Sequence, residues 1–426
     1  MGDWAMLIEF TLRNWRCFAE EAALSMLPSR ERRYAWTMPR FATAPKRLLP
    51  VAFIHGANGS GKSAVLEGLR CLTHLVLHGC EDDGRIPVAP CLLDPQKRRE
   101  PVHFSILFRT SEHVCKYELA LTGRDVVEER LVLFLSKGER ELFVRKGDTL
   151  QLDQSVETAS VHRVFAGTHQ ACPFLTEAGR KGLAFAADPC AWFRETLVFI
   201  GAGDSSGARS GERTAWANTV RCRKELARYL AFLDTGIREL VAGQAGEDRA
   251  CLAQACRHGR ESGRGELCAR HRDALGNEML LDLTRESSGT QRLLDVLQIL
   301  VQPRLDSSRS HVYVLDEIDR SLHPNLLCQL VTEFLLQSSA ASRTQLVATA
   351  QSTVLMEEGL VRRDEVWLAD KGHAGSVLCS VSDFRLPAGR TCHDLQRLAR
   401  WYREGRLGGV PRLVRPLLPL YRKPEK

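Results

Sequence analysis

The chain has 426 residues, 44% of them hydrophobic and 26% charged, which is an ordinary composition for a globular protein large enough to form two compact lobes. The formal net charge of +7 permits a nucleic-acid partner but is too small for this length to require one. No apolar run approaches the roughly 18 residues of a membrane helix, the N-terminus lacks a signal-peptide layout, and the 14 cysteines are scattered. We therefore expect a cytoplasmic protein with reduced thiols and no membrane partner.

The first predicted element is a strand within MLIEFTLRNWRCF. There Ile8, Phe10 and Leu12 alternate with polar residues, as expected for a strand that buries one face. A second strand, short and apolar, is predicted at residues 51–54. It runs directly into a burst of glycine and then into good helix formers from Ser63 onward.

The glycine-rich stretch matches G-x-x-x-x-G-K-[ST], the phosphate-loop (P-loop) pattern, in its strand-loop-helix setting. The matching positions are Gly56, Ala57, Asn58, Gly59, Ser60, Gly61, Lys62 and Ser63. Glycines permit backbone conformations that aim successive N–H groups at one anion, and the helix N-terminus adds a partial positive charge. Lys62 is expected to reach the β- and γ-phosphates, and the Ser63 hydroxyl to bind Mg2+. The motif predicts a nucleoside triphosphate as ligand.

After this helix the sequence predicts a loop at residues 78–95 and a hairpin of two strands, PVHFSILFR and CKYELAL. A flexible loop is predicted at residues 201–216 from its composition, and a helix at residues 221–240 from its apolar stripe. That stripe consists of Leu226, Leu230, Leu233 and Ile237. No sustained heptads follow, so we expect no long coiled coil.

A group of cysteine and histidine residues is a candidate zinc site. It comprises Cys251, Cys256, His258, Cys268 and His271. The spacing matches no common zinc pattern, and chance co-location is the better account in a chain with 14 cysteines and 13 histidines. We predict no metal there.

An acidic pair follows a β-prone apolar run at residues 311–315. Asp316, at the tip of the predicted strand, is expected to bind Mg2+. Glu317 is placed to orient the attacking water or to accept its proton. Without the P-loop, the pair would equally fit a buried strand followed by a solvated turn. Together the two motifs predict an ATPase.

Small hydroxyl residues and a glycine precede a predicted helix upstream of the acidic strand. They are Ser287, Ser288, Gly289 and Thr290. The free N–H groups of such a helix start form a second phosphate-binding surface. The same residues also fit an ordinary helix N-cap, an alternative that the pattern alone leaves open.

Taken together, these motifs resemble those of the ABC-type, RecF/SMC-like AAA family ATPases of bacteria and archaea, a group that includes the RloA-like and anti-phage defence ATPases. The resemblance spans nearly the whole chain. Its markers are MLIEFTLRNWRCF, GANGSGKS, a helix at FLDTGIREL, ESSGT, LDEIDRSLHP and YREGRLGGVP. It implies an α/β P-loop NTPase fold with a two-lobed ABC-type head, one lobe built on a mixed sheet and the other helical.

The resemblance also implies a head-to-tail homodimer that binds ATP and Mg2+. In such a dimer, Ser287 and Gly289 would contact the partner's γ-phosphate as part of the signature loop, residues 287–290. The loop Ser321-Leu322-His323 would couple the two sites. The Q-loop glutamine of ABC-type sites stays unassigned, with Gln96 as a candidate.

The chain departs from the family pattern after the strand that follows the acidic one. Relatives usually carry a Thr-His-Asp switch, whereas Gln351 and Ser352 stand here in place of His and Asp. Gln351 can hydrogen-bond a phosphate or the attacking water, but it cannot carry positive charge. Two alternatives follow: slow hydrolysis with Gln351 in the catalytic site, or an ATP-dependent scaffold that does not hydrolyse.

We divide the chain into four parts: the N-terminal part of the ATPase head at 1–200, a helical insert at 201–280, the signature and acidic motifs at 281–360, and a C-terminal hairpin with a basic helical tail at 361–426. In the tail, arginines alternate with Trp401, Tyr402 and Tyr421. A packed terminal helix with a solvated basic face is the favoured interpretation, and a nucleic-acid surface that includes Arg403, Arg406 and Arg412 is the alternative.

The leading functional hypothesis is an ATPase module of a bacterial defence or DNA-maintenance system that responds to nucleic acid or a phage-derived trigger and controls a separately encoded effector. The ATP-dependent scaffold is the second hypothesis. A transporter engine is disfavoured by the divergent ESSGT. A fused nuclease is disfavoured because the segment after residue 353 is short and lacks an acidic cluster.

Overall fold

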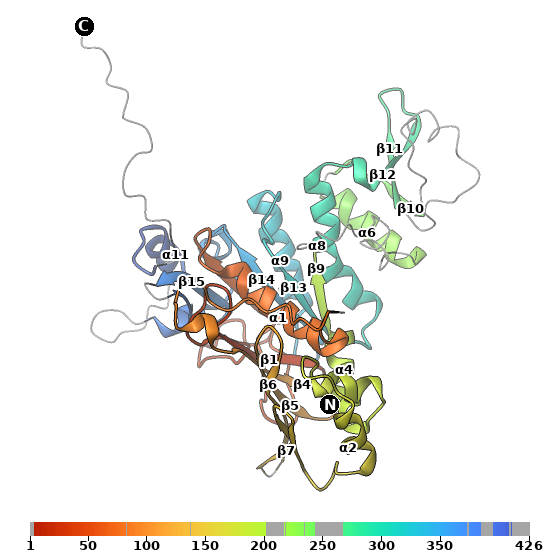
Figure 1. The fold of residues 1–426 in the computed structure, drawn as a ribbon. Coiled ribbons are helices and arrows are strands. Elements are labelled where there is room, and N and C mark those ends of the chain that lie inside the picture. The colour runs from red at the N-terminus through yellow and green to blue at the C-terminus, as the bar shows by residue number, and fades with distance from the viewer. Residues whose placement is uncertain are drawn as a thin grey trace.

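The protein is described from a computed structural model, which covers residues 4–81, 83–136, 138–201, 217, 219–233, 235–242, 267–372, 375–384, 395–408 and 410. Its strands form three sheets (Figure 1). The first is antiparallel, in the order β2-β1-β4-β5-β6-β7-β8. Its strands are β1 Met6–Arg13, β2 Ala22–Ser25, β4 Val102–Arg109, β5 Val114–Leu121, β6 Val126–Leu135, β7 Gly138–Lys146 and β8 Thr149–Leu152.

The predicted opening strand and hairpin are both part of this first sheet. Ile8, Phe10 and Leu12 of β1 are buried while the residues between them are partly exposed, which confirms the predicted alternation. β4 and β5 pair antiparallel across the predicted turn. The sheet turns its buried face toward helix α1, so the first lobe is built around this contact.

The second sheet carries the P-loop. Its order is β16-β15-β3-β14-β13-β9, and all neighbouring pairs are parallel except the edge pair β15 and β16. Its strands are β3 Val51–Gly56, β9 Leu197–Ile200, β13 His311–Leu315, β14 Thr344–Ala350, β15 Val366–Gly372 and β16 Gly375–Ser380. β3 is buried at all six positions, because both faces of a central parallel strand are covered.

Each face of this sheet belongs to a different hydrophobic core. Ala52 and Ile54 face the core shared with the first sheet and with α1 Lys62–His78. Val51 and Phe53 face the core that contains α8 Ser288–Leu305 and α9 Pro324–Gln337. The fold is therefore a mixed α/β P-loop NTPase domain. Its longest described helix, α8, has 18 residues, so no long coiled coil is present in the described part of the chain.

Helix α6 packs on α8, and the third sheet contacts α6 through β10 (Figure 1). The sheet is antiparallel and contains β10 Glu239–Ala242, β11 Leu267–Arg272 and β12 Glu278–Asp282. The predicted helix at residues 221–240 is correct only in its first part, because α6 spans Val220–Phe232. The Thr235 hydroxyl donates to the Leu230 carbonyl at 2.9 Å, and Gly236 has φ +75°, so the chain leaves the helix and enters β10. The helix expected at FLDTGIREL is therefore mainly a turn and a strand.

Short helices complete the described structure. They are η1 Lys97–Arg99, α2 Ala159–Ala166, α3 Phe174–Arg180, α4 Ala184–Ala191, η2 Trp192–Thr196, η4 Leu283–Arg285, α10 Val354–Glu357, η5 Arg363–Glu365, η6 Val381–Asp383 and α11 Leu395–Arg403. The predicted C-terminal hairpin is formed by β15 and β16. The P-loop sheet takes strands from three of the four predicted parts, and the four-part division stays a prediction. Within the described residues, no helix is both long and apolar enough to cross a membrane.

Candidate nucleotide-binding site

The P-loop connects the end of β3 to the start of α1 in a backbone path that needs glycine. Gly59 and Gly61 have φ angles of +71° and +105°. A Cβ atom on Gly61 would lie 2.8 Å from the Cys17 sulfur and 2.9 Å from the Phe18 ring, so no side chain fits there. The loop is held closed by Lys62, whose Nζ donates to the carbonyls of Gly56 at 2.7 Å and Ala57 at 3.0 Å.

The N-terminus of α1 suits an anion. Its N-cap is Gly61, which makes no side-chain capping bond, and its first turn holds no acidic residue. Burial lowers the pKa of Lys62, and the nearby carboxylates of Asp316 and Glu317 act in the opposite direction. A cation and an uncapped helix start therefore face the same loop, which fits the phosphates of a nucleotide.

Asp316 lies beside Ser63 at the carboxyl end of the same sheet. The Ser63 hydroxyl donates to Asp316 Oδ1 at 3.1 Å, and the Thr349 hydroxyl from β14 donates to the same oxygen. The strands β3, β14 and β13 are adjacent and parallel, so their ends meet at one edge. Hydroxyl and carboxylate oxygens are the ligands that Mg2+ prefers, so the pair predicted from sequence fits that ion.

Glu317 follows in a backbone conformation that is uncommon for a residue with a side chain, with φ +49°. Two side chains hold this backbone segment through hydrogen bonds. Its N–H donates to the Thr349 hydroxyl at 2.7 Å, and Arg292 Nη2 from α8 donates to the Asp316 carbonyl at 2.6 Å and the Glu317 carbonyl at 2.7 Å. Burial lowers the pKa of Arg292. This arginine was not predicted as a site residue.

Gln351 lies next to Glu317. Its Nε2 donates to Glu317 Oε1 at 3.1 Å, while Arg320 lies 3.9 Å from the other carboxylate oxygen. The backbone of the predicted switch residues Gln351 and Ser352 is held by Asp319. Its Oδ2 accepts from the N–H groups of Gln351 at 2.8 Å and Ser352 at 2.6 Å. The structure thus brings the predicted acidic and switch residues together, and Asp319 is a second positioning residue that the sequence analysis missed.

These groups surround a cleft of about 480 Å³. Its lining residues are Arg16, Cys17, Asn58, Gly59, Gly61, Lys62, Ser63, Ala64, Glu67, Glu317 and Gln351. Arg16 was missed from sequence; it forms an ion pair with Glu67 at 2.9 Å on the rim. The signal was present, since Arg16 lies in the NWRCF segment that follows β1.

The residues Ser287, Ser288, Gly289 and Thr290 are absent from the lining of this cleft. Ser287 caps α8: its Oγ accepts from the Thr290 N–H at 3.1 Å, so the ordinary N-cap geometry is present. Ser287 and Ser288 are exposed. Within one chain, therefore, the structure does not bring the predicted signature loop to the P-loop.

The other predicted residues fall in varied places. Ser321 has φ +60° in the loop between β13 and α9, and the His323 ring caps α9 by accepting from the Asn325 N–H. Gln96 is exposed in the loop before η1 and does not line the cleft. Strand β9, which pairs with β13 next to Asp316, ends at Ile200 and is followed by Gly201, which has φ +65°.

Part of the cysteine and histidine group can also be placed. Cys268 is buried in β11, and His271 Nε2 lies 2.7 Å from a Glu286 carboxylate oxygen. Cys251, Cys256 and His258 lie outside the described residues, as do Arg412 and Tyr421 of the basic tail.

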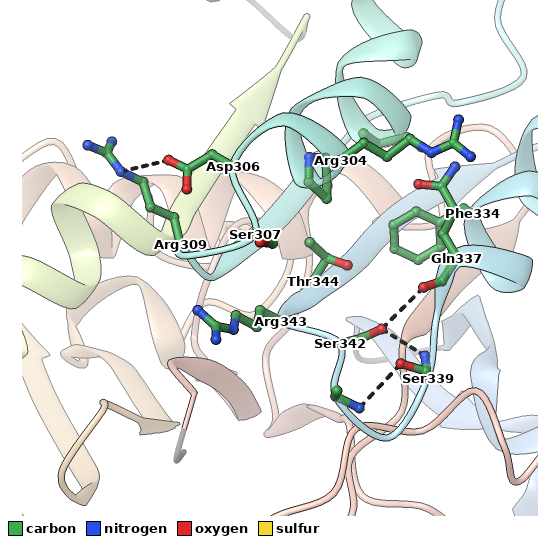
Figure 2. Close-up of a pocket in the computed structure, with 13 residues that line it drawn as sticks. Arg304, Asp306, Ser307, Arg309, Phe334, Gln337, Ser339, Ser342, Arg343 and Thr344 are labelled. Atoms are coloured by element: carbon green, nitrogen blue, oxygen red, sulfur yellow. Dashed lines mark hydrogen bonds and ion pairs between the residues drawn. The ribbon is translucent and has the colours of Figure 1, made fainter. Parts of the chain in front are cut away.

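A second pocket, of about 300 Å³, lies at the opposite edge of the P-loop sheet, where β13 and β14 begin. Three arginines line it, but Figure 2 shows their side chains pointing in different directions. Arg309 pairs with Asp306 at 3.3 Å, Arg304 donates to the Tyr229 hydroxyl, and Arg343 donates to the Ser308 carbonyl. Because the cations do not converge, this pocket does not form a second phosphate site.

A comparison with protein families agrees with this geometry. The model of one family, described as AAA domain, putative AbiEii toxin, Type IV TA system, matches residues 51–166 and 257–357. The match covers slightly more than half of the chain and includes the P-loop, the signature loop, the acidic pair and the switch residues. No curated protein matches the chain.

Proposed function

The chain belongs to this AbiEii-toxin type of AAA domain family, and from that membership and the cleft geometry we propose that it is an ATP-hydrolysing module of a defence or toxin–antitoxin system. The observation that carries the proposal is the position of Glu317 and Gln351 in the same cleft as Lys62 and Ser63. Binding and hydrolytic groups from β3, β13 and β14 converge there, which an ATP-binding structural module would not need.

In the proposed reaction the P-loop amides and Lys62 bind the β- and γ-phosphates of ATP. Ser63 and Asp316 hold Mg2+, which neutralises charge on the phosphates when it is bound. The carboxylate of Glu317 orients the attacking water and accepts its proton. Gln351 fixes that carboxylate through its amide and supplies a hydrogen bond without a charge.

The ATP-dependent scaffold remains the second candidate, and one contact favours it. The amide of Gln351 donates to the Glu317 oxygen that would otherwise receive a proton from water. If this bond persists when ATP is bound, turnover is slow and the protein acts by binding ATP. In either case we propose that a second copy supplies residues 287–290 to the cleft and that a separately encoded effector is the partner.

The test is steady-state phosphate release by the purified protein, together with ATP binding, for three forms. These are the wild type, Glu317→Gln and Gln351→His. Turnover by the wild type that is lost in Glu317→Gln, with ATP binding kept, supports hydrolysis. ATP binding without turnover, with turnover gained in Gln351→His, supports the scaffold. Absence of ATP binding by the wild type contradicts both.

A further inference from the structure

Helix α6 and strand β10 border a groove of about 510 Å³ that is separate from the ATP cleft. It is lined by Val220, Arg223, Lys224, Ala227, Arg228, Ala231, Arg238, Glu239, Leu240 and Val241. Four of these side chains are cationic and one is anionic. The groove is therefore a concentrated positive surface on a chain whose net charge is modest.

The carboxylates near the groove leave part of its positive charge unmatched. Glu239 pairs with Arg270 of β11 at 3.0 Å, and Glu225 pairs with Arg228 at 3.0 Å. Lys224 and Arg238 are exposed, and among the described residues neither forms an ion pair. The guanidinium of Arg228 stays accessible, because its side chain is 77% exposed. The groove can thus neutralise a ligand with several negative charges.

The shape of the α6 face suits a chain-like ligand. Val220, Lys224, Ala227 and Ala231 recur at helical spacing and all line the groove, so the helix face on the groove carries the small side chains of two alanines as well as cations. The opposite face buries Cys222, Leu226 and Leu230 in the core that it shares with α8. The cationic face is thus not required for packing, and small residues on it allow a phosphate backbone to approach the helix.

An exposed aromatic residue continues this surface. Phe232, the last residue of α6, is 73% exposed. It lines an adjoining groove that shares Arg228 and Ala231 with the first. Exposing a phenyl ring to water is unfavourable, and in proteins that bind single strands the stacking of a base on an aromatic ring stabilises the complex. A base in a duplex is already stacked and cannot use such a ring.

We propose that the groove between α6 and β10 binds single-stranded nucleic acid. Phosphates contact Lys224, Arg228 and Arg238, and an unstacked base packs on Phe232. α6 packs on α8, the helix that begins at the signature loop and carries Arg292 (Figure 1). Through this contact, a bound strand can influence the ATP cleft, and this part of the inference rests on the proposed function. Binding itself does not depend on hydrolysis.

The experiment is fluorescence anisotropy of the full chain with a labelled 20-nucleotide mixed-sequence DNA, its RNA counterpart and the DNA duplex, without ATP, over a range of salt concentrations. The test variants are Lys224→Glu with Arg238→Glu, and separately Phe232→Ala. The matched control is Arg221→Glu, because Arg221 is exposed on the same helix but does not line the groove. Circular dichroism melting checks that each variant folds.

The wild type is expected to bind the single strands more tightly than the duplex. The double variant should weaken binding at least about tenfold and make the slope of log K against log salt shallower by roughly 1.4, since each contact contributes ~0.7 for single strands. Phe232→Ala should weaken single-strand binding with the salt slope unchanged, and Arg221→Glu should bind like the wild type.

Several outcomes overturn the proposal. They are no binding by the wild type, equal binding by the double variant, an equal loss in Arg221→Glu, and a preference for duplex that Phe232→Ala leaves unchanged. The charge-reversed pair Arg403→Glu with Arg406→Glu tests the tail, and a loss confined to that pair places the site there instead. ATP turnover, measured on the same preparations, reports separately on the proposed function.

Discussion

Arg292 connects the signature helix to the backbone of the predicted catalytic residue. It comes directly before the first leucines of the apolar stripe of α8, is 8% exposed, and donates to the carbonyl oxygens of the two consecutive residues Asp316 and Glu317. Without a donor these carbonyls lose charge-assisted hydrogen bonds, each worth about 1.5–3 kcal/mol. Because Glu317 already has a positive φ, its carboxylate depends on such external support.

We therefore expect Arg292→Ala to lower kcat by about 10- to 100-fold while the KM for ATP changes by less than about threefold. Arg292→Lys should recover part of the loss, since one donor is restored. Steady-state kinetics with both variants checks this. A purely structural role would instead reduce the amount of folded protein and leave kcat per ATP-binding site unchanged.

His55 is a second residue whose environment has a measurable effect, in this case on how the stability of the protein depends on pH. It directly precedes Gly56, the first residue of the P-loop, and is fully buried, and among the described residues neither of its ring nitrogens has a hydrogen-bond partner. Burial lowers its pKa to about 4. Of the two weaker influences, the Asp319 carboxylate raises the pKa and the Lys62 cation lowers it further. The folded state therefore holds His55 neutral where an unfolded chain would protonate it.

Because the pKa is depressed on folding, the stability linked to His55 is complete above about pH 6.5 and is lost as the pH falls toward 4. Between pH 6.5 and 5 the wild type should lose about 2 kcal/mol more free energy of unfolding than His55→Leu. Urea unfolding at the two pH values measures the difference. Equal losses in the two proteins would assign the acid sensitivity to other groups.

At the scale of elements, the loop between α1 and β4 is fixed to the segment after β1 by one buried side chain. Asn14 Nδ2 donates to the carbonyls of Lys97 at 2.8 Å and Glu100 at 2.8 Å, and Asn14 Oδ1 accepts from the Cys91 N–H at 2.9 Å. Asn14 itself has φ +54°, a conformation that asparagine tolerates better than most residues. The neighbouring Trp15 donates to the Ala64 carbonyl of α1.

Asn14→Ala should lower the free energy of unfolding by about 2–4 kcal/mol, because it leaves buried backbone groups without partners. Ser111→Ala, in the exposed turn between β4 and β5, is the matched control and should change it by less than about 0.5 kcal/mol. Chemical denaturation of the two variants compares them. A loss below 1 kcal/mol in Asn14→Ala would show that the loop is held mainly by its other contacts.

At the scale of the whole molecule, the described chain places the P-loop cleft and the predicted signature loop at two separate positions. The P-loop cleft opens to solvent, and the signature loop is exposed outside it. Two copies arranged head to tail would bring these two parts together. Gly289 belongs to the predicted signature loop, and a Cβ there would already lie 3.1 Å from the Ser321 carbonyl oxygen of the same chain.

The proposed dimer predicts that Glu317→Gln with ATP and Mg2+ elutes as a dimer in light-scattering chromatography and as a monomer without ATP. Adding Gly289→Arg should keep it monomeric with ATP binding intact. Ser307→Arg, exposed just beyond the other end of α8, serves as the control and should still dimerise. A stable dimer in the Gly289→Arg background would exclude the signature loop from the interface.

The sequence by itself determined the features that depend on local order. The P-loop needs glycines and a lysine at set spacing between a strand and a helix, and Gly56 to Ser63 satisfy that requirement without reference to the rest of the chain. The alternation in β1 and the apolar run before Asp316 are equally local, so both strands were predicted correctly. The broad family, that of AAA-type P-loop ATPases, followed from the same short motifs, whereas the match does not extend to the RloA-like group in particular.

The tertiary structure decided which distant residues meet. Arg292 and Asp319 act on the cleft through partners that lie 24 to 33 positions away along the chain, and the sequence pattern of either residue indicates only a solvated charge. The end of α6 at Phe232 depended on the pairing of β10 with β11, which overrides helical periodicity. The distance of the signature loop from the P-loop depends on how α8 packs on the sheet, because local motifs specify chemistry while packing alone specifies position.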